Sequence, residues 1–292
     1  IQITRESGAR LRTEWVFVAL LPLAMYATGA AIGNGQLIVL IMPVLLAAIL
    51  LITRPNSTWK TDLLAAVLMV IALVKPSLSV PFFLLFLFVP GRARPAIVVI
   101  GLYVVLSFTA AGMNESTLHS LILGWMDRAD PSVIPQGVAL SIHTLNTETE
   151  IAGIDSDTII SLLLLVPAGI WVFRNRTVDL WILMGVVAVV ARLWTYHRWY
   201  DDMLLLLPMI ALLRIAGSYG LAAREGVVAA GLFISLWLFL LAPGLHYLPL
   251  PQGVIDLYLL LQLLIWLASA AFLVIEARKE RKELVTAPSN SG

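Results

Sequence analysis

The stretch LLAAVLMVIALVKPSLSVPFFLLFLFVP, Leu63–Pro90, carries a single charge, Lys75. Such a run is too apolar to face water, and a membrane-spanning helix needs about 20 predominantly apolar residues. The stretch is longer than one straight span requires and short for two full spans with a loop between them. Because Pro76 and Pro81 lack a backbone N–H, the sequence predicts two shortened helices that meet at Lys75–Pro76.

Lys75 is a candidate anion-binding residue. A lysine placed in lipid costs about 2.5–3.5 kcal/mol on insertion scales and normally faces a cavity or a counter-ion. The alternative is a lysine that snorkels from a helix end. Against that alternative, the residues that follow are PSLSVP and include no further basic residue.

The composition indicates an integral membrane protein. Of the 292 residues, 60% are hydrophobic and only 13% are charged, and the mean hydropathy is +0.93, whereas a soluble domain has about 25% charged residues. The charges are segregated by loop and give no basic patch for nucleic acid. The absence of cysteine excludes disulfides, thiolate metal sites and iron–sulfur clusters. The predicted fold class is all-α, a polytopic transmembrane helical bundle.

Hydrophobic runs along the chain predict about ten membrane spans. The expected organisation is a cytoplasmic N-terminal segment at 1–12, a transmembrane domain at 13–276 with an outer loop at 113–157, and a cytoplasmic tail at 277–292. The predicted spans cover residues 13–32, 36–53, 62–75, 77–90, 95–112, 158–174, 179–196, 202–215, 226–243 and 254–275.

The basic residues orient this topology. With the N-terminus inside, 15 of the 19 lysines and arginines fall on inner segments, as the positive-inside rule requires. Ten of the 18 acidic residues then fall outside, together with Lys75, Arg128, Arg192 and Arg198. The sequence therefore predicts a multi-pass protein of the inner (plasma) membrane of the cell, with both termini in the cytoplasm.

The longest segment between predicted spans is Met113–Thr158, and loops of this length are usually functional or disordered. Its first part, STLHSLILGWMDRAD from Ser116, has apolar residues at helical spacing, which predicts an interfacial amphipathic helix. Its second part, SIHTLNTETEIAGIDSD from Ser141, is polar and is predicted to line or cover a cavity.

A second polar cluster is RLWTYHRWYDD, Arg192–Asp202, between the seventh and eighth predicted spans. Its Trp and Tyr rings are typical of the headgroup level of a membrane. Three interpretations remain open: an aromatic belt with an Arg–Asp pair, a headgroup or sugar site, and a His/Asp metal site that would need distant ligands. If this segment begins a helix, His197 and Asp201 lie one turn apart on one face.

A very short outer turn, Ile32–Gln36, connects the first two predicted spans. Its two glycines suit a tight turn. Alternatively, the amides of Asn34 and Gln36 could hydrogen-bond a sugar or a phosphate.

Three of these elements follow one another in a recognisable order. The Gly-Asn-Gly-Gln turn at Gly33 precedes a leucine-rich span, an apolar helix ends in Lys75-Pro76, and an aromatic, His-containing turn runs into YDDMLLLLP from Tyr200. Over roughly Phe17–Arg214, this pattern resembles the glycosyltransferase family 87 proteins of the GT-C superfamily. Those are polytopic enzymes similar to the polyprenyl-phosphate-mannose-dependent mannosyltransferases of actinobacteria.

The resemblance implies a GT-C-like fold in which Gln36 and Lys75 line an outward-facing cavity. Lys75 would meet the phosphate of the donor. The substrate-binding residues expected from the resemblance and from the polar clusters are Asn34, Gln36, Lys75, His197, Arg198, Tyr200 and Asp201.

The catalytic base is the missing part of the pattern. The family keeps a carboxylate in its first outer loop, and no outer-face Asp precedes Gln36 here. Because the sequence begins at Ile1, we expect the C-terminal portion of a longer enzyme, or a half completed by another chain, with the base upstream. Asp201 and Asp202 are the fallback catalytic residues.

The expected reaction is transfer of a sugar, mannose by the resemblance, from a polyprenyl-phosphate donor to a glycolipid or other envelope acceptor on the outer face. Such a transfer needs a base for the acceptor hydroxyl and positive charge on the departing phosphate. No cofactor is expected, although a divalent metal is compatible with these residues. Membrane lipids and another membrane subunit are the further expected partners. The alternatives are a non-catalytic accessory subunit of a membrane complex and a secondary transporter.

Overall fold

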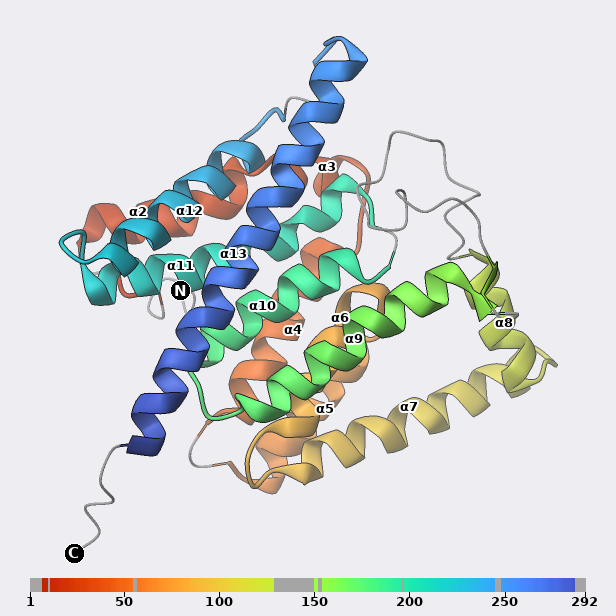
Figure 1. The fold of residues 1–292 in the computed structure, drawn as a ribbon. Coiled ribbons are helices and arrows are strands. Elements are labelled where there is room, and N and C mark those ends of the chain that lie inside the picture. Colours follow the sequence, from red (N-terminus) through yellow and green to blue (C-terminus); the bar gives the residue numbers. More distant parts are fainter. Residues whose placement is uncertain are drawn as a thin grey trace, which may run out of the picture. The chain divides into compact units, whose positions relative to one another are not determined.

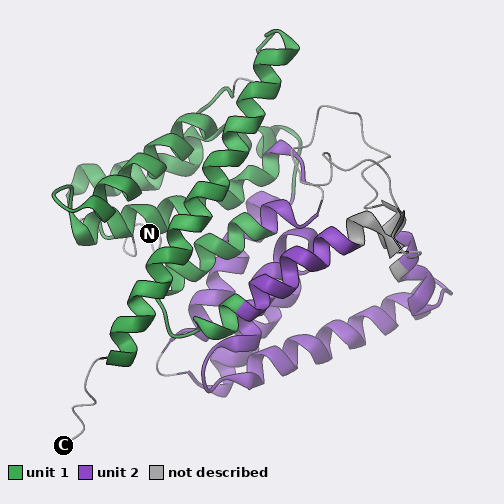
Figure 2. Cartoon of the chain, viewed as in Figure 1, with its two compact units in different colours: residues 1–36, 171–190, 200–292 green, residues 37–170, 191–199 purple. Residues whose placement is uncertain are grey.

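The computed structural model describes residues 7–9, 11–54, 57–128, 150–151, 154–195, 197–244 and 248–286. Two compact units are distinguished in Figure 2: unit 1 comprises residues 1–36, 171–190 and 200–292, and unit 2 comprises residues 37–170 and 191–199. The regular secondary structure of the described residues is helical apart from a hairpin of two-residue strands, β1 (Glu150–Ile151) and β2 (Ile154–Asp155). The predicted all-α class is therefore confirmed.

The described residues of unit 2 form the following helices (Figure 1): α4 (Ile38–Ile52), α5 (Trp59–Ala72), α6 (Pro76–Phe88), α7 (Ala93–Met113), α8 (Leu118–Arg128) and most of α9 (Ser156–Arg174). Helix α5 packs against both α4 and α7. Ala65 and Ala66 on α5 are fully buried, and such small side chains let apolar helices approach closely.

Unit 1 is formed by α2 (Arg12–Ala24), α3 (Tyr26–Gly33), most of α10 (Leu180–Leu193), the 3₁₀ helix η3 (Trp199–Leu205), α11 (Leu206–Tyr219), α12 (Arg224–Leu240) and α13 (Gln252–Thr286). Every residue from Leu206 to Leu212 of α11 is buried. Gly185 of α10 permits close packing here, since a Cβ atom at this position would lie 2.8 Å from Leu273 Cδ1 and 3.2 Å from Pro208 Cα.

The first predicted span, 13–32, is interrupted in the structure. Helices α2 and α12 lie side by side (Figure 1), and the Phe17 ring packs edge-on against Phe233 and Trp237. At the end of α2, Met25 adopts an extended conformation and pairs with Leu241. The segment predicted as the first span therefore consists of two helices, α2 and α3, separated at Met25.

Three described helical segments are long and apolar enough to cross a membrane: α7, the continuous segment Trp199–Tyr219 formed by η3 and α11, and α13. The number rises to four if α3 and α4 together form one broken span. The predicted number of about ten spans is not supported. Several helices occupy the predicted positions but are short; the 13 residues of α6 extend about 20 Å, whereas a bilayer core is about 30 Å thick.

Two other local predictions are confirmed: the break between two helices at Lys75 and the helix at the start of the outer loop. Helices α5 and α6 end and begin on either side of Lys75, and α8 covers the predicted amphipathic segment. Helix α13 continues to Thr286, beyond the predicted span end at 275. Most of the second part of the outer loop lies outside the described residues, as do residues 1–6 and 287–292.

Candidate functional site

Lys75 lies in a hydrogen-bonded turn of unit 2. It is the N-cap residue of α6, and Pro76 occupies the first turn, where its missing N–H costs no hydrogen bond. The Lys75 carbonyl accepts a hydrogen bond from the N–H of Leu78 at 3.1 Å. The buried Ser79 hydroxyl donates to the carbonyl of Ala72 at 2.6 Å and ties α6 back to the end of α5. The Lys75 side chain is half-buried.

Trp194 brings the aromatic cluster to this turn. Its indole Nε1–H donates to the carbonyl of Ser77 at 2.6 Å, although the two residues are 117 positions apart. The carbonyl of Trp194 in turn accepts a hydrogen bond from the Ser161 hydroxyl of α9, also at 2.6 Å. Within unit 2, the Lys75–Pro76 turn and the start of the Arg192–Asp202 segment are therefore neighbours, as the site hypothesis requires.

The charged residues of that segment differ in exposure. Arg192 and His197 are buried, whereas Arg198 is exposed. The 3₁₀ helix begins at Trp199, so His197 precedes it, and the condition for a one-turn pairing of His197 with Asp201 is not met. Among the described residues no group of three His, Cys, Asp or Glu side chains could hold a metal ion.

Asp202 belongs to a buried polar triad in unit 1. The Tyr26 hydroxyl of α3 donates to Oδ2 of Asp202, and Nε2 of Gln262 from α13 donates to the same hydroxyl at 3.1 Å. All three side chains are buried. Burying a carboxylate is costly unless it is hydrogen-bonded, so this triad joins η3 to α3 and α13. Asp201 is also buried, and Tyr200 is half-buried.

Sequence reasoning missed Tyr26, Gln262 and Trp194. Gln262 carried a usable signal, because it is the one amide in the predicted span 254–275 and polar side chains inside apolar helices usually bond across a helix interface. Tyr26 and Trp194 could pass for ordinary membrane aromatics, and nothing local indicates their partners.

Asn34 and Gln36 form a tight turn at the end of α3. Gly35 has a φ of 61°, which glycine adopts without strain. The amide of Asn34 donates to the carbonyl of Ala30 at 2.9 Å, and that of Gln36 donates to the carbonyl of Asn34 at 3.4 Å. Asn34 is exposed and Gln36 is half-exposed. The turn interpretation is confirmed, and a contact of these amides with a sugar or phosphate stays a prediction.

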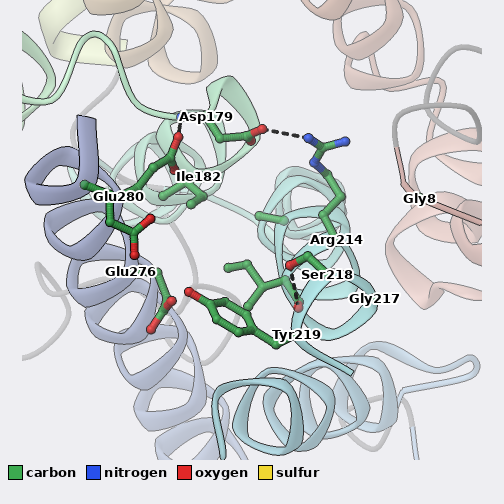
Figure 3. Close-up of a pocket in the computed structure, with 12 residues that line it drawn as sticks. Gly8, Asp179, Ile182, Arg214, Gly217, Ser218, Tyr219, Glu276 and Glu280 are labelled. Atoms are coloured by element: carbon green, nitrogen blue, oxygen red, sulfur yellow. Dashed lines mark hydrogen bonds and ion pairs between the residues drawn. The ribbon is translucent and has the colours of Figure 1, made fainter. Parts of the chain in front are cut away.

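A cavity of about 520 Å³ opens in unit 1 between α10, α11 and the charged end of α13 (Figure 3). Its wall includes Asp179, Arg214, Tyr219, Glu276 and Glu280. None of the residues predicted as substrate-binding lines it. Glu276 lies 14 positions beyond Gln262 on α13, a separation of about 21 Å along a straight helix, so this cavity is far from the Tyr26–Asp202–Gln262 triad.

Ion pairs and helix capping hold the cavity wall together. Asp179 precedes α10; its Oδ1 accepts the N–H of Trp181 at 2.8 Å, and its Oδ2 pairs with Arg214 Nη2 at 2.6 Å. Glu280 accepts the N–H of Asp179 at 3.0 Å (Figure 3). Burial raises the pKa of the Glu280 carboxyl, and the neighbouring Asp179 carboxylate raises it further. At one edge, Lys279 pairs with both Glu276 and Glu225, at 2.7 and 2.9 Å.

No family model, curated protein or solved structure matches the chain.

Proposed function

We propose that the chain is part of a membrane glycosyltransferase that takes a sugar, mannose by the resemblance, from a polyprenyl-phosphate donor on the outer face. The observation that carries the proposal is the hydrogen bond from Trp194 to the carbonyl of Ser77. It supports the proposal because it joins the Lys75–Pro76 turn to the aromatic segment, two of the three elements on which the resemblance depends.

In this proposal Lys75 binds the donor phosphate. A half-buried lysine at the start of α6 adds its charge to the partial positive charge of a helix N-terminus, and both favour a phosphate. As the sugar leaves, negative charge grows on that phosphate, so fixed positive charge lowers the barrier. The turn is held by Ser79 and Trp194, which limits the reorganisation needed when charge develops.

Asp201 and Asp202 are the two fallback carboxylates for the base, and both are buried. Oδ2 of Asp202 accepts the Tyr26 hydroxyl, and a hydrogen bond to the charged form makes a carboxylate a weaker proton acceptor. In a chain that transfers sugar, Asp201→Asn and Asp202→Asn test the two residues separately. Loss of turnover with unchanged donor binding in one variant would identify the base.

The donor-binding proposal can be tested with two ligands of equal chain length, a polyprenyl monophosphate and the corresponding polyprenol. The purified protein in detergent micelles should bind the phosphate more tightly, and Lys75→Met should remove that preference. Hydrogen bonds to charged groups contribute about 1.5–3 kcal/mol, so the preference should fall by about 10- to 150-fold.

The matched control is Lys282→Met, which removes an exposed lysine from the end of α13. It should keep the preference for the phosphate. If wild-type protein binds both ligands equally, or if Lys75→Met keeps the full preference, Lys75 does not bind the donor phosphate.

A secondary transporter is the second candidate. Interrupted helices favour it: α3 and α4 form a broken pair, and α5 and α6 are separated at Lys75. Transporters use such interruptions to bind substrate and coupling ions near the membrane midplane. Flux of a phosphorylated sugar across reconstituted vesicles, without sugar transfer to a lipid acceptor, would favour this candidate.

A further inference from the structure

Four cationic side chains gather at one end of unit 2. Arg54 follows α4, Lys60 lies in the first turn of α5, and Arg92 and Arg94 lie at the start of α7. We call these residues, together with Trp59 and Asp62, the basic patch. Helix α5 packs against both α4 and α7, which brings these chain segments together.

Arg92 fixes the geometry of the basic patch. Its guanidinium donates to the carbonyl of Ile52 at 2.7 Å and to the carbonyl of Arg54. These carbonyls lie at the C-terminal end of α4, where a cation interacts favourably with the helix dipole. Arg92 therefore holds the α6–α7 turn against the end of α4 and places Arg54 beside it.

Arg94 is only partly neutralised. Its guanidinium carbon lies 5.5 Å from the centre of the Trp59 ring, and Nη1 is 3.6 Å from Oδ2 of Asp62, a long separation for an ion pair. The side chain is 59% exposed. Asp62 is buried, and its other oxygen, Oδ1, has no hydrogen-bond partner among the described residues.

The charges of the basic patch do not balance. Among the six residues of the basic patch, four are cationic and Asp62 alone carries a carboxylate. Lys60 and Arg54 are exposed, and within the described part of the chain neither side chain forms an ion pair. The patch therefore has a surplus of positive charge close to its surface.

The surface next to the patch is apolar. Trp59 is 54% exposed, and Leu63 and Leu64, one turn further along α5, are also exposed, as is Ile97 of α7. Exposed cations and a Trp ring beside exposed aliphatic side chains match the headgroup and acyl-chain regions of a lipid leaflet. A water-soluble anion would gain nothing from the aliphatic surface.

We propose that the basic patch binds the headgroup of an anionic phospholipid, with the acyl chains against the exposed faces of α5 and α7. Arg94 and Lys60 contact the phosphate, and Trp59 lies at the level of the glycerol backbone. Arg92 positions the patch and does not bind the lipid itself. This proposal does not depend on sugar transfer and would stand if the transferase assignment failed.

Native mass spectrometry of the full chain in detergent, titrated with phosphatidylglycerol or phosphatidylcholine, tests the proposal. The protein should bind phosphatidylglycerol more tightly than phosphatidylcholine. Each basic residue near an anionic surface is worth about a fivefold change in affinity, so Lys60→Gln with Arg94→Gln should weaken phosphatidylglycerol binding about 25-fold. Binding of phosphatidylcholine, whose quaternary ammonium offsets the charge of its phosphate, should weaken much less.

Arg281→Gln with Lys282→Gln is the matched control, because it removes the same two charges from exposed positions of α13. It should leave the affinity for phosphatidylglycerol unchanged. An equal loss in both double variants would mean that net charge, and not the basic patch, determines binding, and would overturn the proposal.

A change at Asp62 provides a test that a misfolded variant cannot mimic. Asp62→Asn removes the competing carboxylate and should tighten phosphatidylglycerol binding about fivefold. Unchanged or weaker binding would contradict the proposed role of Arg94. Inorganic phosphate at the same concentration should not compete, and full competition would show a site for a free anion instead of a lipid.

Discussion

The hydroxyl of Tyr26 donates a hydrogen bond to Oδ2 of Asp202, a residue 176 positions later in the chain. Gln262 bonds the same hydroxyl, so one buried tyrosine connects α3, η3 and α13 within unit 1. In an apolar helix bundle such a bond has no water to replace it. The triad therefore determines how these elements of unit 1 pack together.

The first prediction concerns this triad. Tyr26→Phe removes a hydrogen bond to a buried carboxylate and should lower the free energy of unfolding by about 1.5–3 kcal/mol. Thermal denaturation in detergent measures the change. A double-mutant cycle with Asp202→Asn should give a coupling energy of at least about 1 kcal/mol, because the two side chains are in contact.

The control Tyr103→Phe, on an exposed ring of α7, should change stability by less than about 0.5 kcal/mol. Equal effects of the two Tyr→Phe changes would contradict the prediction.

The positions of the helices could be predicted because their signals are local. Pro76 begins α6, and Gly220, with a φ of 70°, ends α11. The break at Met25 was not predicted. Met25 pairs there with Leu241, which lies 216 positions later in the chain, and a hydropathy profile contains no information about such a partner.

For the candidate site, the sequence indicated the segments but not their contacts. Lys75 and the aromatic segment differ clearly from their apolar surroundings, and the structure joins them through Trp194 and Ser77. The cavity beside Asp179 and Arg214 was missed. In the sequence Asp179 and Arg214 lie at the ends of the predicted spans 179–196 and 202–215, where charged residues are common, and only tertiary packing brings them to the carboxylates of α13.

The second prediction concerns Trp194. Trp194→Phe removes the indole N–H and leaves the Ser77 carbonyl without this donor, which should cost about 1–3 kcal/mol of stability. The control is Trp237→Phe, since Nε1 of Trp237 has no hydrogen-bond partner among the described residues and a phenyl ring can keep the edge contact with Phe17. If Lys75 binds a phosphate, Trp194→Phe should also reduce the preference for polyprenyl phosphate over polyprenol. Unchanged stability and unchanged preference would show that this hydrogen bond does not hold the turn.

The third prediction concerns the pH dependence of stability at Glu280. This residue lies beyond the apolar part of α13, and burial raises the pKa of its carboxyl in the folded protein. A raised pKa means that the folded state binds the proton more tightly, so the contribution of Glu280 to stability is full at low pH and is lost as the pH rises through the folded-state pKa. Glu280→Gln keeps an oxygen acceptor for the Asp179 N–H without the charge. The variant should therefore be more stable than wild type at pH 8, and the difference should disappear below about pH 4, under the ordinary pKa of glutamate.

Thermal midpoints measured from about pH 3 to pH 8 check this expectation, because this range extends on both sides of the ordinary pKa of glutamate. Asp256→Asn is the control, because it changes an exposed carboxylate near the other end of the same helix and should alter stability by less than about 0.5 kcal/mol. A Glu280→Gln variant that is less stable than wild type at pH 8 would show that the charge of Glu280 stabilises the cavity wall.

The fourth prediction concerns topology. The distribution of basic residues predicts that the end of α7 faces outward and that the end of α13 faces the cytoplasm. Met113 and Val285 are 82% and 77% exposed at those two positions, and the chain has no native cysteine that would react in the background. A membrane-impermeant maleimide should therefore label Met113→Cys in intact cells and Val285→Cys only after permeabilisation. The unaltered chain should give no signal in either condition. The reverse labelling pattern would show that the orientation is inverted. Labelling of both positions in intact cells would place both helix ends outside. The chain would then cross the membrane an even number of times between them, which contradicts the prediction.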